Sequence, residues 1–322
     1  MFMFLIQLLG LAVFLASIAV VVLLVFSDGD LVLMRKKLRR EYFRDRVVWV
    51  TGASSGIGEA IARSLSRIGA KVILSSRTES KLEAVRQSLD HPDNAKVLVM
   101  DVANTDGMEK YVSEAIGLFG HVDMLVNNAG VAQRGLYSQF TLDTQRRLFE
   151  VDFFGQITLT KALLPHFVQR GGGHIANVSS IAGKVGSAGR TIYCGAKFAL
   201  IGYMDALRME LQGLEANVAV TNICPGPVAT NVDSNALNGD GTRHGQADKL
   251  IQGGMKPERC AELSLVAMSN RLPEAWICPQ PLLMAGYLSQ YCPHICFKLA
   301  KKVAPRMVKE VQQATEGSKK DS

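Results

Sequence analysis

The chain has 322 residues, of which 48% are hydrophobic and 20% are charged. This composition excludes a disordered or collagen-like protein and provides enough apolar material for a sizeable core. The 36 lysines and arginines exceed the 29 aspartates and glutamates, giving a net charge of +7, and many of these cations gather near the two ends of the chain. Because basic clusters beside apolar sequence suit an anionic membrane surface, we expect a membrane partner and no nucleic-acid binding.

The first segment, residues 1–27, is almost uniformly apolar and carries no charge from Met1 to Phe26. As a helix this stretch would extend about 39 Å, enough to span a hydrocarbon core of about 30 Å. A cleaved signal peptide is the alternative, but its apolar stretch usually has about 7 to 15 residues behind a basic start. We therefore expect an uncleaved N-terminal transmembrane helix, followed by a basic linker over residues 28–45.

The cations that follow this segment predict its orientation. Five of them lie close together in the linker, within residues 35–40: Arg35, Lys36, Lys37, Arg39 and Arg40. The positive-inside rule then places the rest of the chain on the cytosolic side. The chain ends in Lys319-Lys320-Asp321-Ser322, which fits a dilysine signal for retrieval to the endoplasmic reticulum. The expected location is therefore the membrane of the endoplasmic reticulum, with the rest of the chain facing the cytosol.

Residues 46 to about 225 alternate between short β-branched runs and longer stretches with helical spacing. Strands are expected at 47–50, 71–75, 96–100, 124–127, 174–178 and 218–223. Helices are expected at 58–68, 79–89, 106–119, 142–169, with or without an interruption near Pro165, and 191–212. The strands are continuous apolar runs, as strands covered on both faces require. This order predicts an α/β fold with a doubly wound parallel sheet of the Rossmann type.

A glycine-rich turn follows the first expected strand and leads into a helix. Its sequence is Thr51-Gly52-Ala53-Ser54-Ser55-Gly56-Ile57-Gly58. Such a turn lets the backbone approach a pyrophosphate, whose charge the helix N-terminus favours. Three glycines alone fit an ordinary turn equally well.

The end of the second strand bears on the type of cofactor. An NAD site usually offers a carboxylate there for the ribose 2′-hydroxyl, whereas this chain has Ser76 and Arg77. A guanidinium can instead pair with a 2′-phosphate, so we expect NADP(H), although Arg77 could also be a solvated loop residue. Further cofactor contacts are expected after the third and fourth strands, from Asp101, Val102, Asn128, Ala129 and Gly130.

Three side chains after the fifth strand predict proton chemistry. Tyr193 and Lys197 are four residues apart and share one helical face, with Ser180 13 residues upstream of Tyr193. A lysine cation favours the phenolate form of a nearby tyrosine, which could then exchange a proton with a carbonyl or alcohol oxygen. Ser180 could hydrogen-bond the same oxygen. Tyrosine and lysine at this spacing are also frequent on plain helix surfaces.

Taken together and in this order, these motifs and the Pro225-Gly226 turn closely resemble the short-chain dehydrogenase/reductase family over about residues 44–275, and in particular a membrane-bound branch of it. The resemblance implies one domain, residues 46–275, with about seven strands, and pairing into homodimers or tetramers. It implies Tyr193 as acid/base, Lys197 as its partner on the nicotinamide ribose, and Ser180 as the positioning residue. Its cofactor set is Gly52, Ser54, Ser55, Gly56, Ile57, Gly58, Arg77, Asp101, Val102, Asn128, Ala129, Gly130, Tyr193, Lys197, Pro225, Gly226, Val228 and Thr230.

One position departs from the family pattern. Asp152 stands where the family usually has an asparagine that helps to hold a water beside the active-site lysine. A carboxylate there favours the lysine cation but removes a donor and adds negative charge. We expect a slowed or pH-shifted enzyme, with Asp152 counted among the catalytic residues.

The remaining segments refine the expected function. Residues 231–254 are polar and lie where the family places a lid. Residues 276–322 form an extension that is first apolar and then basic. We expect either a segment that lies on the membrane surface or at a lipophilic substrate entrance, or a segment that only packs over the core. The cysteine spacing predicts no metal site. The leading hypothesis is an NADP(H)-dependent oxidoreductase that interconverts a carbonyl and an alcohol on a lipophilic molecule such as a steroid, retinoid or fatty aldehyde. The alternative is a membrane-tethered NADPH-binding scaffold or sensor with little turnover.

Overall fold

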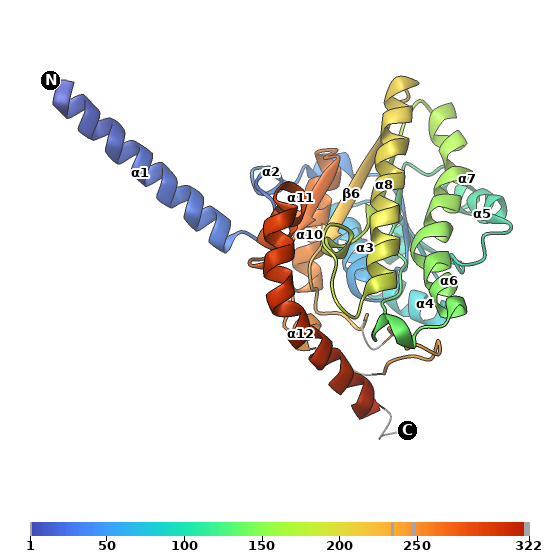
Figure 1. Cartoon of the computed structure of the whole chain (residues 1–322). Helices are drawn as coiled ribbons and strands as arrows, with labels where there is room; N and C mark the ends of the chain where they lie inside the picture. Colours follow the sequence, from blue (N-terminus) through green and yellow to red (C-terminus); the bar gives the residue numbers. More distant parts are fainter. Residues whose placement is uncertain (1, 233–234, 246–248, 319–322) are drawn as a thin grey trace.

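The sheet at the centre of the protein has seven parallel strands in the order β3-β2-β1-β4-β5-β6-β7, seen in a computed structural model that describes residues 2–232, 235–245 and 249–318 (Figure 1). The strands are β1 (Val47–Thr51), β2 (Lys71–Ser76), β3 (Ala95–Val99), β4 (Met124–Asn127), β5 (Gly173–Val178), β6 (Val218–Pro225) and β7 (Glu274–Ile277). The predicted doubly wound α/β sheet is confirmed. The order reverses between β1 and β4, and ligands bind at such a switch point in open α/β sheets.

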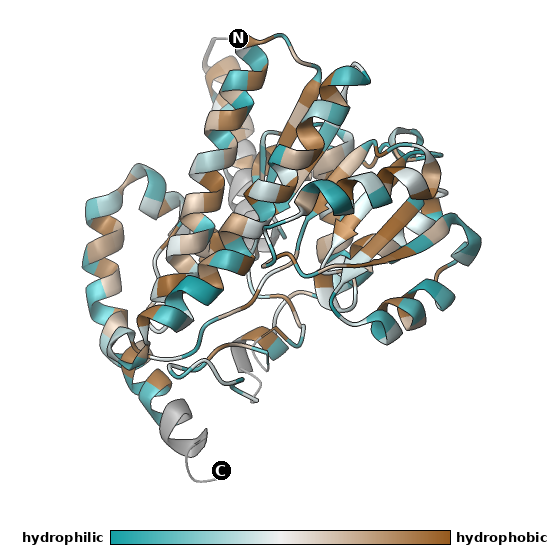
Figure 2. Cartoon of the chain, turned by 90° about the vertical axis from the view of Figure 1, so that its right-hand side faces the viewer, coloured by the Kyte–Doolittle hydropathy of each residue, from teal (hydrophilic) through white to brown (hydrophobic). Residues whose placement is uncertain are grey.

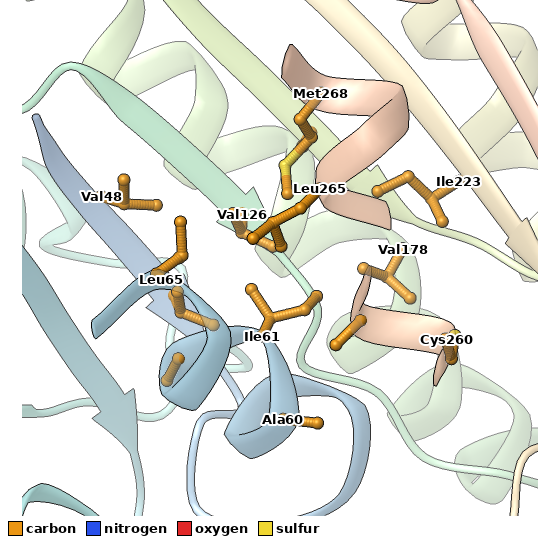
Figure 3. Close-up of a cluster of buried hydrophobic side chains, with 14 of the residues drawn as sticks. Val48, Ala60, Ile61, Leu65, Val126, Val178, Ile223, Cys260, Leu265 and Met268 are labelled. Carbon is orange, nitrogen blue, oxygen red and sulfur yellow. The ribbon is translucent and has the colours of Figure 1, made fainter. Parts of the chain in front are cut away.

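Helices cover both faces of the sheet. They are α3 (Gly56–Ile68), α4 (Glu79–Gln87) and α10 (Pro257–Ser269) on one face, and α5 (Met108–Phe119), α7 (Gly155–Gln169) and α8 (Thr191–Gly213) on the other. Along β1, Val48 and Val50 pack against the first layer and Trp49 against the second. Figure 3 shows Val48 of the sheet beside Ile61 and Leu65 of α3, and Figure 2 shows hydrophobic residues concentrated along the central strands. Both faces are therefore buried, as the continuous apolar strands require.

The helix expected over 142–169 is two helices joined by a wider turn. α6 (Leu142–Phe149) passes into a π-helical turn, η4 (Glu150–Phe154), before α7 begins. The interruption therefore lies at Asp152 and not near Pro165, which sits inside α7. Gly155 permits the close approach that follows, because a Cβ there would lie 2.1 Å from the carbonyl oxygen of Val102. Such π turns insert one extra residue and often occur at functional sites.

A helix, α1 (Phe2–Phe26), forms where the transmembrane segment is predicted, and it projects away from the body in Figure 1. Among the residues that the structure describes, no helix is both long enough and apolar enough to cross a membrane. The membrane-spanning part of the expectation therefore stays a prediction.

The predicted basic linker, 28–45, packs onto the body. Asp30 caps the short helix α2 (Leu31–Met34) by accepting hydrogen bonds from the backbone N–H groups of Val32 and Leu33, and η1 (Arg40–Tyr42) follows. Leu33 and Phe43 are fully buried in the layer formed by α3 and α10. The segment was predicted to be a linker because of its many cations, but these two buried apolar residues make it part of the core.

The C-terminal part differs from the expected extension at its start. The predicted boundary after residue 275 falls inside β7, so Trp276 is a buried strand residue. Two helices follow, α11 (Leu282–Tyr291) and α12 (Pro293–Ser318). The remaining short elements are η2 (Pro92–Asn94), η3 (Tyr137–Gln139), η5 (Ile181–Gly183) and α9 (Lys249–Gln252).

Candidate active site

The glycine-rich turn after β1 is held against the turn after β4. Asn128 donates from Nδ2 to the carbonyl oxygens of Thr51 at 2.9 Å and Gly52 at 3.2 Å, and Thr51 Oγ1 accepts from two N–H groups of the β4 turn. Gly52 has a φ of +64°, and a Cβ on Gly58 would lie 2.4 Å from Gly52 O. Glycine is therefore required at Gly52 by conformation and at Gly58 by space.

A cavity of about 320 Å³ follows the carboxyl ends of the strands. Most of the predicted cofactor residues line it: Gly52, Ser54, Ser55, Gly56, Ile57, Arg77, Asp101, Val102, Asn128, Ala129, Gly130, Tyr193, Lys197 and Thr230. Gly58 lies behind the turn and does not line it. Pro225, Gly226 and Val228 line a second cavity instead, and Thr230 lines both.

The end of the cavity near β2 is basic. Arg77 is joined there by Lys81, which lies four residues further along and was not predicted. The Ser76 hydroxyl is buried, and no described residue hydrogen-bonds to it. Two cations and an unengaged hydroxyl therefore give this end of the cavity positive charge and a free hydrogen-bonding group. The i, i+4 spacing of Arg77 and Lys81 is the signal that could have revealed the second cation.

Lys197 of α8 and Asp152 of the π turn form a buried ion pair. Lys197 Nζ lies 3.2 Å from Asp152 Oδ2 and 3.3 Å from the carbonyl oxygen of Val178, and Asp152 Oδ1 accepts from Val131 N at 2.7 Å. Asp152 is completely buried and Lys197 nearly so. Burial alone would lower the pKa of Lys197, but the Asp152 carboxylate and then Tyr193 raise it above its ordinary value. The lysine is therefore held as a cation.

Tyr193 stands one helical turn from this cation and faces both cavities. Lys197 Nζ lies 5.6 Å from the centroid of the Tyr193 ring. The second cavity, of about 190 Å³, is also lined by Ser180, whose Oγ donates to Pro225 O at 3.3 Å and accepts from Ala182 N at 3.1 Å. The predicted group of Ser180, Tyr193 and Lys197 therefore gathers where the two cavities meet.

Gln133 supports this group and has no recognisable sequence signal. Its side chain is fully buried, and its Oε1 accepts from the backbone N–H groups of Ile192 at 2.7 Å and Tyr193 at 3.2 Å. It thereby satisfies N–H groups in the first turn of α8, where Arg190 makes no side-chain cap. A residue 60 positions away in sequence thus fixes the start of the helix that carries Tyr193.

Part of the predicted lid, residues 231–254, is hydrogen-bonded to the segment after β4 and to the start of α6. Leu237 pairs with Gln133 and exchanges backbone hydrogen bonds with Ala132 and Arg134. Gly239 O accepts from the backbone N–H of Thr141 and from the Thr144 hydroxyl. Residues 233–234 and 246–248 of the predicted lid lie outside the described residues. The described part crosses from Thr230 and Asn231, which line the first cavity, to α6.

The geometry fits a nicotinamide dinucleotide. Ser55 at the start of α3 makes no side-chain cap, which leaves first-turn N–H groups available for a diphosphate. The first cavity, which we call the cleft, continues from its basic end near β2 past Asn128 to Tyr193. A doubly wound sheet defines a dinucleotide-dependent oxidoreductase when its cleft has a glycine-rich turn in its wall and a tyrosine and a lysine at the end away from β2.

Comparison with known proteins then identifies the family. A family model described as short chain dehydrogenase matches residues 46–240, and the chain belongs to the short-chain dehydrogenase/reductase family, whose members use NAD(P)(H) and act on CH-OH groups. The chain is 37% identical to Dehydrogenase/reductase SDR family member 7 of Homo sapiens over 90% of this chain and 88% of that protein. It is 34% identical to Dehydrogenase/reductase SDR family member 7B of Mus musculus over 83% and 84% of the two chains. The predicted resemblance is confirmed.

Solved structures agree with the fold. A short-chain dehydrogenase/reductase of Burkholderia phymatum, solved in complex with NAD, superposes with a TM-score of 0.70 at 22% identity and covers 79% of this chain and 96% of its own. A short-chain dehydrogenase of Streptomyces avermitilis gives a TM-score of 0.67 at 28% identity, with coverages of 81% and 97%.

We predict that Asp152→Asn moves the pH dependence of alcohol oxidation. The substitution removes a buried negative charge beside Lys197, and the uncompensated cation then favours the deprotonated form of Tyr193. We expect the oxidation rate to reach its plateau on the order of 1 pH unit lower, measured as kcat against pH.

The matched control is Asp143→Asn, which makes the same change at an exposed position of α6. An unchanged profile for Asp152→Asn would show that the carboxylate does not set the charge balance of the site.

Proposed function

We propose that the protein is an NADP(H)-dependent oxidoreductase that interconverts a carbonyl and an alcohol on a lipophilic substrate of the steroid, retinoid or fatty aldehyde class. The observation that carries the proposal is the position of Tyr193, which lines both the cofactor cleft and the second cavity while Lys197 lies beside its ring.

The proposed chemistry divides between the cofactor and three side chains. When bound, the cofactor supplies or accepts the hydride. In reduction, Tyr193 donates its hydroxyl proton to the carbonyl oxygen, and the Lys197 cation stabilises the phenolate that remains. Ser180 turns its hydroxyl from Pro225 O to the same oxygen and holds the carbonyl carbon toward the cofactor. In oxidation, each proton moves in the opposite direction.

The lining of the second cavity supports a lipophilic substrate. Its walls are mainly apolar, with Ile181, Ala182, Val185, Val228, Ile251 and Leu282 among them. Arg190 supplies its one formal charge among the described lining residues. Burying apolar substrate surface here contributes roughly 25 cal/mol per Å². Such a cavity favours a molecule with a long apolar body and one reactive oxygen.

The test is a panel of lipophilic carbonyl compounds offered to the purified protein with NADPH and with NADH. We expect turnover of steroid, retinoid or long-chain aldehydes in the presence of NADPH. If no member of the panel oxidises either cofactor above background, the proposed activity is wrong.

The preference for NADP(H) rests on the basic end of the cleft, and we predict that Arg77→Asp reverses it. The substitution removes charge-assisted hydrogen bonds worth about 1.5–3 kcal/mol and places a carboxylate beside the 2′-phosphate. We expect the KM for NADPH to rise about 10- to 100-fold while the KM for NADH stays equal or falls.

The control for this prediction is Arg67→Asp, which makes the same change on α3 at a well-exposed residue that does not line the cleft. An unchanged ratio of the two KM values in Arg77→Asp would assign the cofactor preference to other residues.

We also propose that α1 attaches the protein to the membrane of the endoplasmic reticulum, with the folded domain on the cytosolic side. The side chains of Met3, Phe4, Leu9 and Phe14 are exposed apolar groups on this helix. The basic residues 35–40 follow it, as the positive-inside rule requires of a cytosolic flank. Alkaline extraction should leave the full chain in the membrane pellet, whereas a chain without residues 2–26 should extract, and equal extraction of both would refute the proposal.

A further inference from the structure

The helices α11 and α12 lie on the side of the body from which α1 projects (Figure 1). The chain between α1 and α2 is fastened to β7, because Asp30 N donates to Trp276 O at 2.9 Å and Trp276 N donates to Asp30 Oδ2 at 2.7 Å. α11 packs on the same place, with the rings of Trp276 and Tyr287 4.8 Å apart. The base of α1 and the start of the α11–α12 pair are therefore joined.

The exposed surface of α12 combines cations with apolar side chains. The cations are Lys298, Lys301, Lys302, Arg306 and Lys309, and the exposed apolar residues are Ile295, Phe297, Leu299 and Val303. By helical spacing seven of them share one face, and Lys301 and Phe297 lie further round the helix. We call these nine exposed residues the basic face. Glu310, which pairs with Arg306 at 2.9 Å, is the acidic residue of α12 whose surroundings the structure describes. A cluster of exposed lysines and arginines beside exposed apolar side chains suits the surface of an anionic bilayer.

The opposite face of α12 packs beside the second cavity. Val311 is buried against Gly189, where a Cβ would lie 2.6 Å from Val311 Cγ2. The neighbours of Gly189, Ser187 and Arg190, line the cavity. The first residue of α11, Leu282, lines it too. The two helices therefore connect the base of α1 to the wall of the apolar cavity.

We propose that the basic face docks on an anionic phospholipid bilayer and places the opening of the second cavity at the lipid interface, so that a lipophilic substrate enters from the bilayer. The substrate part of this proposal rests on the function proposed above, and the docking part does not. Each lysine or arginine close to an anionic surface contributes about 1 kcal/mol of attraction. A second copy of the chain would fit poorly, because a two-fold contact would bring the same five cations together.

The test uses the full chain with a fluorescent label on Cys292, the exposed cysteine between α11 and α12. Cys296→Ser removes the other cysteine that is not buried. The protein is reconstituted into vesicles of phosphatidylcholine with or without about one third phosphatidylserine, with brominated acyl chains as quenchers. Because α1 is present in every sample, quenching at Cys292 reports the position of α12. We expect strong quenching in the anionic vesicles and little in the neutral ones.

The matched variants carry the same total change of charge. The first is Lys298→Glu with Lys302→Glu and Arg306→Glu, and the control is Lys96→Glu with Lys110→Glu and Lys161→Glu, all exposed and on other elements. We expect the first variant to lose quenching roughly tenfold or more and the control to keep it. Docking would be overturned if quenching were the same with and without phosphatidylserine and the same in the first variant and the unmodified chain. The absence of any quenching would also overturn it. If the fluorescence of the label on Cys292 in detergent changed with protein concentration, α12 would contact a second copy of the chain. That result would also overturn docking on the bilayer.

Turnover separates the two proposals. In the first variant, the KM for a long-chain aldehyde supplied in anionic vesicles should rise about tenfold, while turnover of a short, water-soluble aldehyde stays unchanged. Equal KM values for the vesicle-borne aldehyde in the variant and the unmodified chain would refute substrate entry from the bilayer. If no aldehyde is turned over by the unmodified chain, the proposed function fails while the quenching result stands by itself.

Discussion

Tyr193→Phe should reduce kcat by about 10²- to 10⁴-fold, the usual contribution of a positioned proton donor. The substitution removes one hydroxyl and keeps the ring where the two cavities meet. The substitution leaves Lys197 and the glycine-rich turn after β1 unchanged. The Kd for NADPH should therefore stay within about twofold of its original value. Stopped-flow turnover and fluorescence titration with NADPH measure the two quantities.

Tyr203→Phe is the matched control, since Tyr203 lies on the same helix and is exposed beside Phe153. Full activity in Tyr193→Phe would remove the chemical basis of the proposed function and favour an NADPH-binding scaffold or sensor.

Lys197→Met should abolish turnover and also destabilise the fold by about 3–5 kcal/mol, because it leaves the Asp152 carboxylate buried without its cation. Burial raises the pKa of Asp152, an effect that Lys197 partly offsets in the unmodified protein. In the variant, the folded state therefore holds a proton that the unfolded state releases. Stability should then fall as the pH rises, so the deficit is smallest in acid and largest near neutrality. Denaturant unfolding at a series of pH values measures this.

The double variant Lys197→Met with Asp152→Asn separates the two effects. Removing the carboxylate should recover most of the lost stability and abolish its pH dependence, with no return of turnover. If the double variant is as unstable as the single one, the loss comes from packing and not from an unpaired charge.

The sheet and most cleft residues could be predicted because their signals are local. The four apolar residues at the start of β1, the glycine-rich turn after it and the four-residue spacing of Tyr193 and Lys197 each lie within a short run of consecutive residues. The π turn could not be predicted, since a run of helical spacing does not show where one residue is inserted. Asp152 was singled out as unusual, but its direct ion pair with Lys197 depends on that turn.

Residues that act across elements had no comparable signal. Gln133 contacts the start of α8 from the far end of the turn after β4. Leu33 and Phe43 sit among cations, so their burial was hidden by the charge of the segment. In each case the interaction depends on how separate segments are placed in space.

The pairing of Leu237 with Gln133 makes exposure of the cleft and readiness for proton transfer interdependent. The backbone of Gln133 pairs with Leu237 of the predicted lid, and its side-chain oxygen accepts a hydrogen bond from the backbone N–H of Tyr193. Any movement that lifts Leu237 to admit or release a dinucleotide also withdraws support from the phenol. The protein should therefore be least able to exchange protons while it exchanges cofactors.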